Sequence, residues 1–211
     1  MRYLIALMFF LSLSNARAEI TLTVLDQDNL PVDDAVITVP QQFIGTPNKV
    51  AVMDQVNESF VPRVLVVQKG QYVSFPNSDD IRHHVYSFSQ PKSFEIKLYK
   101  GTAIEPILFD KPGLVVLGCN IHDDMIGYII VADNALVFKT DENGQVTLPV
   151  KKGDKISLWT ERTLQGIDVA VPITITGEAE QSITMELLPP PIEMMDHGSM
   201  TKGFGKPKWS N

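Results

Sequence analysis

Residues 118–127 read Gly-Cys-Asn-Ile-His-Asp-Asp-Met-Ile-Gly, and they lie between two apolar segments at 114–117 and 128–131. Cys119, His122 and Met125 are spaced three residues apart, twice over. Between two strands, this spacing makes a tight loop that can close around one ion. A thiolate, an imidazole and a thioether form a soft ligand set, which selects copper over calcium, magnesium or manganese. The stretch therefore predicts a copper-binding loop.

A second histidine is needed to complete a known type of copper site. Two His, one Cys and a weak axial Met form the blue-copper (type 1) electron-transfer site. Besides His122, the chain offers His83 and His84 upstream, and His197 near its end. Successive residues of a strand point to opposite faces, so His83 and His84 cannot both bind in the same way.

The rest of the chain reads as strands separated by turns that are rich in Gly, Pro, Asn and Asp. Many short strands with regular turn signals are typical of β-sandwiches and barrels. We therefore predict an all-β fold, although residues 92–100 could hold a helical turn. The segments rich in Val, Ile, Leu, Phe and Tyr are 20–25, 35–39, 64–67, 72–75, 84–88, 114–117, 128–131, 136–138, 145–149, 156–159, 170–175 and 182–187.

Residues 50–132 resemble a cupredoxin of the plastocyanin and amicyanin type. The resemblance is carried by Phe60-Val61-Pro62, the segment 64–70, Val73-Ser74-Phe75, Asn77 six residues before His83, and the Cys119, His122, Met125 spacing. It implies a Greek-key β-sandwich over residues 46–134 that holds one type 1 copper ion, cycling between Cu(I) and Cu(II). It also implies His83, Cys119 and His122 as equatorial ligands and Met125 as the axial ligand, with His84 as the alternative upstream ligand.

The sequence departs from the cupredoxin pattern near the predicted ligands. His84 stands where the family usually has Asn, and Gly118 stands where it usually has an aromatic residue. Asp123 and Asp124 replace apolar residues of the loop. These two carboxylates would lower the reduction potential and could steer a basic partner, or they could form only a solvated turn. Asp79 and Asp80 are expected to be solvated surface residues.

The flanking segments 19–45 and 135–187 resemble the two halves of a transthyretin-like module of the carboxypeptidase-regulatory type. The resemblance is carried by Asp28-Asn29-Leu30-Pro31 and by Thr140-Asp141-Glu142-Asn143-Gly144. It implies a second, small β-sandwich module that is split around the cupredoxin domain. The alternative is one independently pairing N-terminal strand followed by an unrelated C-terminal β domain.

Residues 1–18 have the parts of a secretory signal peptide. Arg2 is followed by an apolar run over residues 3–13 and by the small-x-small pattern Ala16-Arg17-Ala18. The run is too short to span a bilayer, so we expect a periplasmic protein with no stable membrane insertion after cleavage. With 18 Lys+Arg against 25 Asp+Glu, the chain has a formal charge of −7, which disfavours nucleic-acid binding.

The segment 188–211 is expected to be a flexible tail. It places three Met and one His within residues 194–200, and such residues suit Cu(I). The tail could therefore load or unload copper, or it could be an unstructured end with incidental Met residues.

Taken together, the sequence predicts an electron carrier, not an enzyme, that exchanges single electrons with transiently bound redox proteins. No hydrolytic constellation is visible, because each His outside the tail belongs to the copper pattern. Two alternatives remain open. One is a copper carrier or buffer that uses the Met/His tail, and the other is a structural or interaction protein with a vestigial site.

Overall fold

The computed structural model of the protein describes residues 19–45, 50–101 and 105–189. Within these ranges the regular structure consists of seventeen β-strands and no α-helix, which confirms the predicted all-β fold. In the same ranges, no helix has the length and hydropathy that a membrane span requires. The predicted signal peptide and the Met/His segment 194–200 lie outside the described residues.

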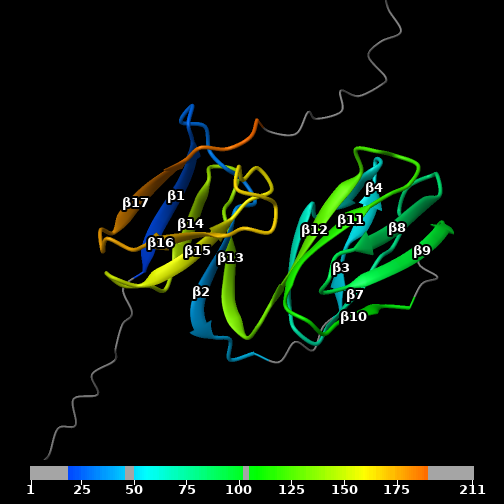
Figure 1. Ribbon diagram of the computed structural model, residues 1–211, viewed down its shortest axis with the longest axis horizontal. Helices are drawn as coiled ribbons and strands as arrows, with labels where there is room; N and C mark the ends of the chain where they lie inside the picture. The colour runs from blue at the N-terminus through cyan, green and yellow to red at the C-terminus, as the bar shows by residue number, and fades with distance from the viewer. Residues whose placement is uncertain (1–18, 46–49, 102–104, 190–211) are drawn as a thin grey trace, which may run out of the picture.

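One half of the structure, which we call the site half, contains strands β3 to β12 (Figure 1). Its large sheet has the order β6-β12-β11-β8-β9, and a three-stranded sheet has the order β10-β7-β3. Phe75, Phe109, Val85, Leu117 and Ile129 are buried in one core cluster of this half. The strands are β3 (Ala51–Val52), β4 (Asp54–Val56), β5 (Ser59–Val61), β6 (Val64–Gln68), β7 (Gln71–Ser74), β8 (His83–Phe88), β9 (Ser93–Tyr99), β10 (Ile107–Phe109), β11 (Gly113–Gly118) and β12 (Ile126–Ala132).

The other half, which we call the flanking half, combines the two ends of the described chain (Figure 1). Its sheets have the orders β14-β1-β17 and β13-β2-β15-β16, so β1 pairs with two strands that lie far away in the sequence. Along β1, buried and half-buried residues alternate, because successive side chains point to opposite faces. The strands are β1 (Ile20–Asp26), β2 (Val36–Gln42), β13 (Ala135–Lys139), β14 (Gln145–Leu148), β15 (Lys155–Trp159), β16 (Val171–Thr174) and β17 (Glu180–Met185).

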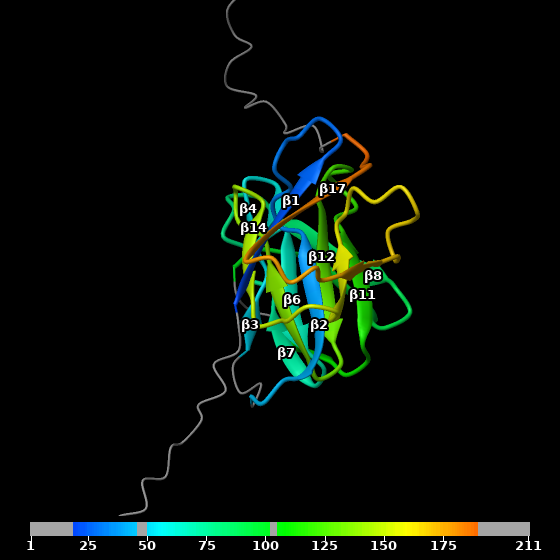
Figure 2. The same cartoon turned by 90° about the vertical axis from the view of Figure 1, so that its left-hand side faces the viewer.

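The two halves have separate cores and meet through a third apolar cluster. Val36 and Trp159 of the flanking half pack with Val64 and Tyr128 of the site half in this cluster. The rings of Tyr128 and Trp159 meet edge to face, with 5.4 Å between centroids. In Figure 2, β1 and β17 of the flanking half lie in front of strands of the site half. That each half is an independent domain with the predicted boundaries stays a prediction.

The helical turn considered for residues 92–100 is wrong, because this segment forms strand β9. Strand β9 pairs with β8 in antiparallel register, with Ile96 opposite Val85 and Phe94 opposite Ser87. Both Phe94 and Ile96 contact the core of the site half. Pairing along the edge of the large sheet therefore fixes the conformation of this segment.

Candidate metal centre

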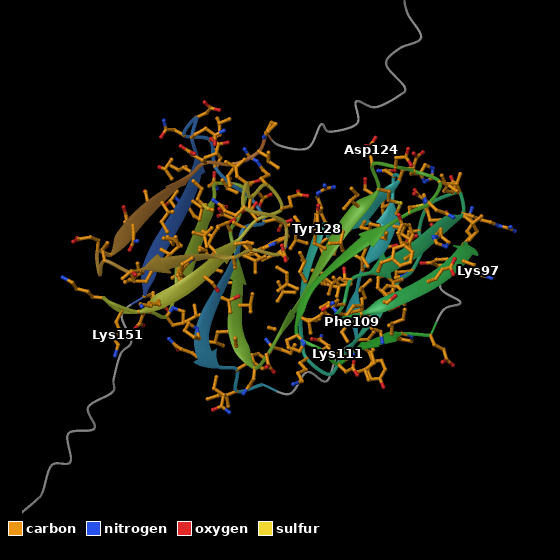
Figure 3. The ribbon with its side chains drawn as sticks, viewed as in Figure 1. Lys97, Phe109, Lys111, Asp124, Tyr128 and Lys151 are labelled. Carbon is orange, nitrogen blue, oxygen red and sulfur yellow. The ribbon has the colours of Figure 1, made fainter. Side chains whose placement is uncertain are left out.

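The predicted ligand loop connects β11 to β12. Strand β11 ends at Gly118 and β12 begins at Ile126, so Cys119, His122 and Met125 all lie in the short connection. The Met125 N–H donates a hydrogen bond to the His122 carbonyl at 3.1 Å, and the Ile126 N–H donates to the Asp124 carbonyl at 3.0 Å. These bonds make the connection a closed turn. In Figure 3, Asp124 of this turn lies at the opposite end of the site half from Lys111.

The structure brings His83, Cys119 and His122 together. The Cys119 Sγ lies 4.0 Å from Nδ1 of His83 and 3.7 Å from Nδ1 of His122. One ligand atom from each residue lies within 4.8 Å of the other two, and the imidazole centroids are 5.0 Å apart. His83 and Cys119 are buried, and His122 is half-buried. This end of the sandwich thus gathers two nitrogens and one sulfur at a single point.

His84 does not join this cluster. Its Nε2 lies 2.9 Å from Glu95 Oε1 on the neighbouring strand β9, and its ring contacts Tyr86 at 5.5 Å between centroids. Its Nδ1 is buried and has no hydrogen-bond partner within the part of the chain that the structure describes. Since His83 and His84 are adjacent residues at the start of β8, they point to opposite faces. Of the two upstream candidates, only His83 is close to Cys119.

Met125 is almost fully buried, with 1% of its surface exposed, and it belongs to the same core cluster as Cys119. The thioether is therefore part of the interior beneath the loop and does not face water. Its predicted role as the axial ligand stays a prediction.

Asp79 differs from the expectation of a solvated surface residue, because it holds the far nitrogen of His83. Its Oδ2 lies 2.7 Å from His83 Nε2, and its side chain is only 13% exposed. Burial alone would raise the pKa of the Asp79 carboxyl. Hydrogen bonds from the Glu58 N–H, from His83 and from the Asn57 N–H nevertheless bring this pKa below its ordinary value of 3.8. The carboxyl is thus an ionised acceptor at neutral pH.

Sequence reasoning missed Asp79 because its partners come from a different part of the chain. The N–H groups that bind it belong to the turn between β4 and β5, about twenty residues upstream. Nothing in the Asp79-Asp80 pair shows which carboxylate faces inward. The only available signal is the four-residue interval between Asp79 and His83.

The far nitrogen of His122 lies closer to solvent. Its Nε2 is 3.6 Å from Glu58 Oε2, and the imidazole side chain is 19% exposed while that of Glu58 is 41% exposed. This separation is too long for a hydrogen bond. His122 is therefore the member of the cluster whose edge reaches the surface.

The loop before His83 is held by buried hydrogen bonds. Asn77, six residues before His83, donates from Nδ2 to the carbonyls of Ile81 at 3.0 Å and Tyr99 at 2.8 Å. Its Oδ1 accepts from the Asp79 N–H at 3.0 Å. Asn77 thus fixes both the loop and the position from which Asp79 reaches His83.

The structure accounts for Gly118 where the cupredoxin pattern has an aromatic residue. Gly118 of β11 is opposite Tyr86 of β8, and a Cβ at position 118 would lie 2.8 Å from the Tyr86 ring and hydroxyl. The ring that lies beside Gly118 belongs to Tyr86 of the neighbouring strand β8. A larger residue at position 118 would clash with Tyr86 in its present position.

The two sulfur–nitrogen separations of the cluster fit a transition-metal ion. A metal about 2.3 Å from sulfur and about 2.0 Å from nitrogen, the lengths found at zinc sites, separates sulfur and nitrogen by about 3.5–3.7 Å for bonds about 110–120° apart. The two sulfur–nitrogen distances of 3.7 and 4.0 Å need little movement to reach this range. Thiolate and imidazole are ligands of copper and zinc, not of calcium or magnesium.

No family model matches the chain, and no curated protein matches it. Among solved structures, the chain is similar to the copper-containing nitrite reductase NirK from Thermus scotoductus SA-01, with 25% identity over 52% of this chain and a TM-score of 0.39. It spans only 28% of that enzyme's chain.

Two further solved structures are cupredoxins that the chain covers along their whole length. A reduced amicyanin variant is 20% identical over 47% of this chain, with a TM-score of 0.36. A purple cupredoxin from Nitrosopumilus maritimus is 18% identical over 40% of this chain, with a TM-score of 0.35. Since all these TM-scores lie below 0.5, only the side chains of this chain itself indicate what the site can bind.

Proposed function

We propose that the protein holds one type 1 copper ion and carries single electrons between redox partners. The observation that supports this most directly is the meeting of His83 Nδ1, Cys119 Sγ and His122 Nδ1 at one end of the site half. Two imidazoles and one thiolate are the equatorial set of a blue-copper site. Bound copper would supply one-electron exchange between Cu(II) and Cu(I).

In this proposal, the protein supplies a site whose ligands need not move when the copper ion changes between Cu(II) and Cu(I). His83 is fixed by the start of β8 and by Asp79, while Cys119 and His122 belong to a turn closed by its own hydrogen bonds. Burial of His83 and Cys119 excludes water from two of the three ligands. His122, with its partly exposed edge, is the proposed route by which electrons leave.

We propose Met125 as the axial ligand and His84 as a residue outside the ligand set. Met125 is buried in the core cluster that contains Cys119. His84 is paired with Glu95 instead. A thioether at the axial position would be a weak, long ligand that tunes the reduction potential.

The wider assignment is also a proposal. We propose an exported, periplasmic electron carrier, not an enzyme, whose redox partners bind briefly. The leader-like composition of residues 1–18 supports export. The pairing of β1 with β14 and β17 supports one flanking module split around the copper domain, with boundaries at 19–45 and 135–187.

The test is the spectrum of the purified protein with one equivalent of Cu(II). We expect an intense blue colour and a small copper hyperfine splitting in electron spin resonance, both lost in Cys119→Ser. His83→Gln should also lose the blue colour. The matched variant His84→Gln should keep it, because His84 points away from the cluster.

A pale complex with ordinary hyperfine splitting in the wild type would contradict the electron-transfer proposal. Loss of the blue colour in His84→Gln, with retention in His83→Gln, would contradict the proposed ligand set while leaving a copper site in place.

A further inference from the structure

Asp79 is the most completely bonded carboxylate near the metal cluster. Its Oδ1 accepts a hydrogen bond from the Asn57 N–H at 2.7 Å, and its Oδ2 accepts one from the Glu58 N–H at 2.8 Å. The same Oδ2 lies 2.7 Å from His83 Nε2. Both oxygens of Asp79 already accept backbone N–H groups, so they act as acceptors at this place, and Nε2 of His83 donates in this contact.

The two backbone donors come from one turn of unusual geometry. Asn57 and Glu58 join β4 to β5, and both have positive φ angles, of 51° and 57°. Two consecutive residues in this region form the tight hairpin turn that suits twisted strands. This turn directs both N–H groups at a single side chain, Asp79.

A second carboxylate fastens the same hairpin to the same loop. Asp54, at the start of β4, accepts hydrogen bonds from the Ser78 hydroxyl at 2.8 Å and from the Ser78 N–H at 3.2 Å. The loop that precedes His83 is therefore attached to the β4–β5 hairpin at two adjacent residues. Asp79 cannot shift without disturbing both attachments.

We infer that Asp79 is a positioning residue for the metal centre: held by the β4–β5 turn, it keeps the proton of His83 on Nε2 and leaves Nδ1 free to face the Cys119 sulfur. This inference rests on the proposed copper function and deepens it. A carboxylate that accepts a hydrogen bond from the far nitrogen of a metal-binding His fixes the orientation of the ring. It also makes the other ring nitrogen a more basic metal ligand.

The same contact sets the electrostatics of the site. Asp79 places a negative charge next to a buried imidazole, where screening by water is weak. A negative charge stabilises the more positive oxidation state of a bound metal. Asp79 should therefore lower the reduction potential.

Asp80 provides a matched control one residue away. Its side chain is fully exposed and lies 3.5 Å from the Lys100 ammonium, and it makes no contact with His83 among the described residues. Removing its charge changes the net charge of the protein by the same amount as Asp79→Asn. Any effect of overall charge alone appears in both variants.

The first measurement uses the metal-free protein and nuclear magnetic resonance of its imidazole protons. We expect a His83 Nε2–H resonance that exchanges slowly with water in the wild type, in Asp79→Asn and in Asp80→Asn. Asp79→Asn should keep this resonance, because an amide oxygen can still accept the hydrogen bond from Nε2–H. It should be lost in Asp79→Ala. A rapidly exchanging proton in the wild type would overturn the inference.

The second measurement is the reduction potential of the copper-loaded variants. At a fixed potential, Asp79→Asn should raise the ratio of reduced to oxidised protein at least tenfold, equivalent to about 59 mV for one electron. Asp80→Asn should change it less than twofold. Equal shifts in the two variants would overturn the inference, since a surface charge would then explain both.

The two measurements separate the inference from the function on which it rests. If the wild type binds no blue copper, the proposed function fails, but the protected Nε2–H still tests the contact in metal-free protein. If the wild type is blue and Asp79→Asn behaves like Asp80→Asn, the function stands and the positioning role is wrong. Asp79→Asn keeps the test open should Asp79→Ala fail to fold.

Discussion

Tyr99 is a single buried side chain that joins three segments around the metal centre. Its hydroxyl donates to the Phe75 carbonyl at 2.6 Å and accepts a hydrogen bond from the Gln55 side-chain amide, while its own carbonyl accepts from Asn77. Burial is the main cause that raises its pKa from 10.0 to about 12. The neutral phenol is therefore the form that the folded protein requires.

This shift predicts a loss of stability at alkaline pH. The pKa of Tyr99 is raised in the folded state, so its contribution is complete below pH 10 and is lost as the pH rises through about 12. The pKa of Tyr128 is also raised from 10.0 to about 12, again mainly by burial. The free energy of unfolding, measured by denaturant titration, should fall between pH 10 and pH 12. A constant value across this range would contradict the prediction.

Tyr99→Phe tests the same residue at neutral pH. The variant leaves the buried Phe75 carbonyl without its donor, which should cost about 1–3 kcal/mol of unfolding free energy. Tyr72→Phe is the control, because Tyr72 is 48% exposed and its loss should change stability little. Equal stability of Tyr99→Phe and wild type would show that the hydrogen bond contributes nothing measurable.

At the residue scale, the sequence predicted the members of the cluster better than their supports. The spacing of Cys119 and His122 and the pair His83-His84 were visible directly, and the structure brings the first three together. The Asp79 contact was not visible, because it depends on a turn near residue 57 that folds against the loop. The spacing from Asn77 already favoured His83 over His84, and the structure places His83 next to Cys119 and His84 next to Glu95.

At the scale of elements, two glycines let neighbouring strands approach the ligand loop closely. Gly118 leaves space for Tyr86 at one end of the loop, and Gly127 leaves space for Phe60 of β5 at the other. A Cβ on Gly127 would lie 2.8 Å from the Cβ of Phe60. The β4–β5 hairpin, whose turn holds Asp79, thus packs directly against the start of β12.

Gly127→Ala should therefore destabilise the protein and disturb the hairpin. The added methyl group overpacks a buried contact, at an expected cost of about 1–3 kcal/mol. The cost should be smaller when Phe60 is first replaced by Ala, because Cγ and Cδ2 of Phe60, each 3.0 Å from the added methyl group, are then absent. Denaturant titration of the single and double variants measures this difference. Equal costs in both backgrounds would show that the ring of Phe60 is not the obstacle.

Strand positions were predictable because most strands are short runs rich in Val, Ile, Leu, Phe and Tyr between turn signals, as in β11 and β12. In β9 the sequence also carries the period-two pattern of a strand, because residues 93–98 alternate between polar and apolar as Ser-Phe-Glu-Ile-Lys-Leu. The helical turn considered for this segment therefore had no support in the local pattern. The β4–β5 hairpin, by contrast, has only three residues in each strand, which is too short for a local pattern to indicate.

At the scale of the whole molecule, Arg63 connects the two halves. Its guanidinium donates three hydrogen bonds to the Glu161 carboxylate, at 2.8, 3.0 and 2.8 Å, and a fourth to the Ile126 carbonyl at 3.3 Å. It also lies over the Tyr128 ring, 5.8 Å from the centroid. Such a contact between segments about a hundred residues apart was not predictable from composition or spacing.

We expect the Arg63–Glu161 pair to couple the stabilities of the two halves. Replacing either residue should lower the free energy of unfolding and leave the copper spectrum unchanged. The pair is bidentate and half-buried, with side chains 36% and 16% exposed, so removing one partner should cost about 1–3 kcal/mol, between the values for surface and buried pairs. Arg63→Met, Glu161→Gln and the double variant, followed by denaturant titration, give the coupling energy. Since the metal cluster is built only from the site half, all three variants should stay blue. Additive costs would show that the ion pair does not couple the halves, which other contacts such as the apolar cluster of Val36, Val64, Tyr128 and Trp159 would then hold together.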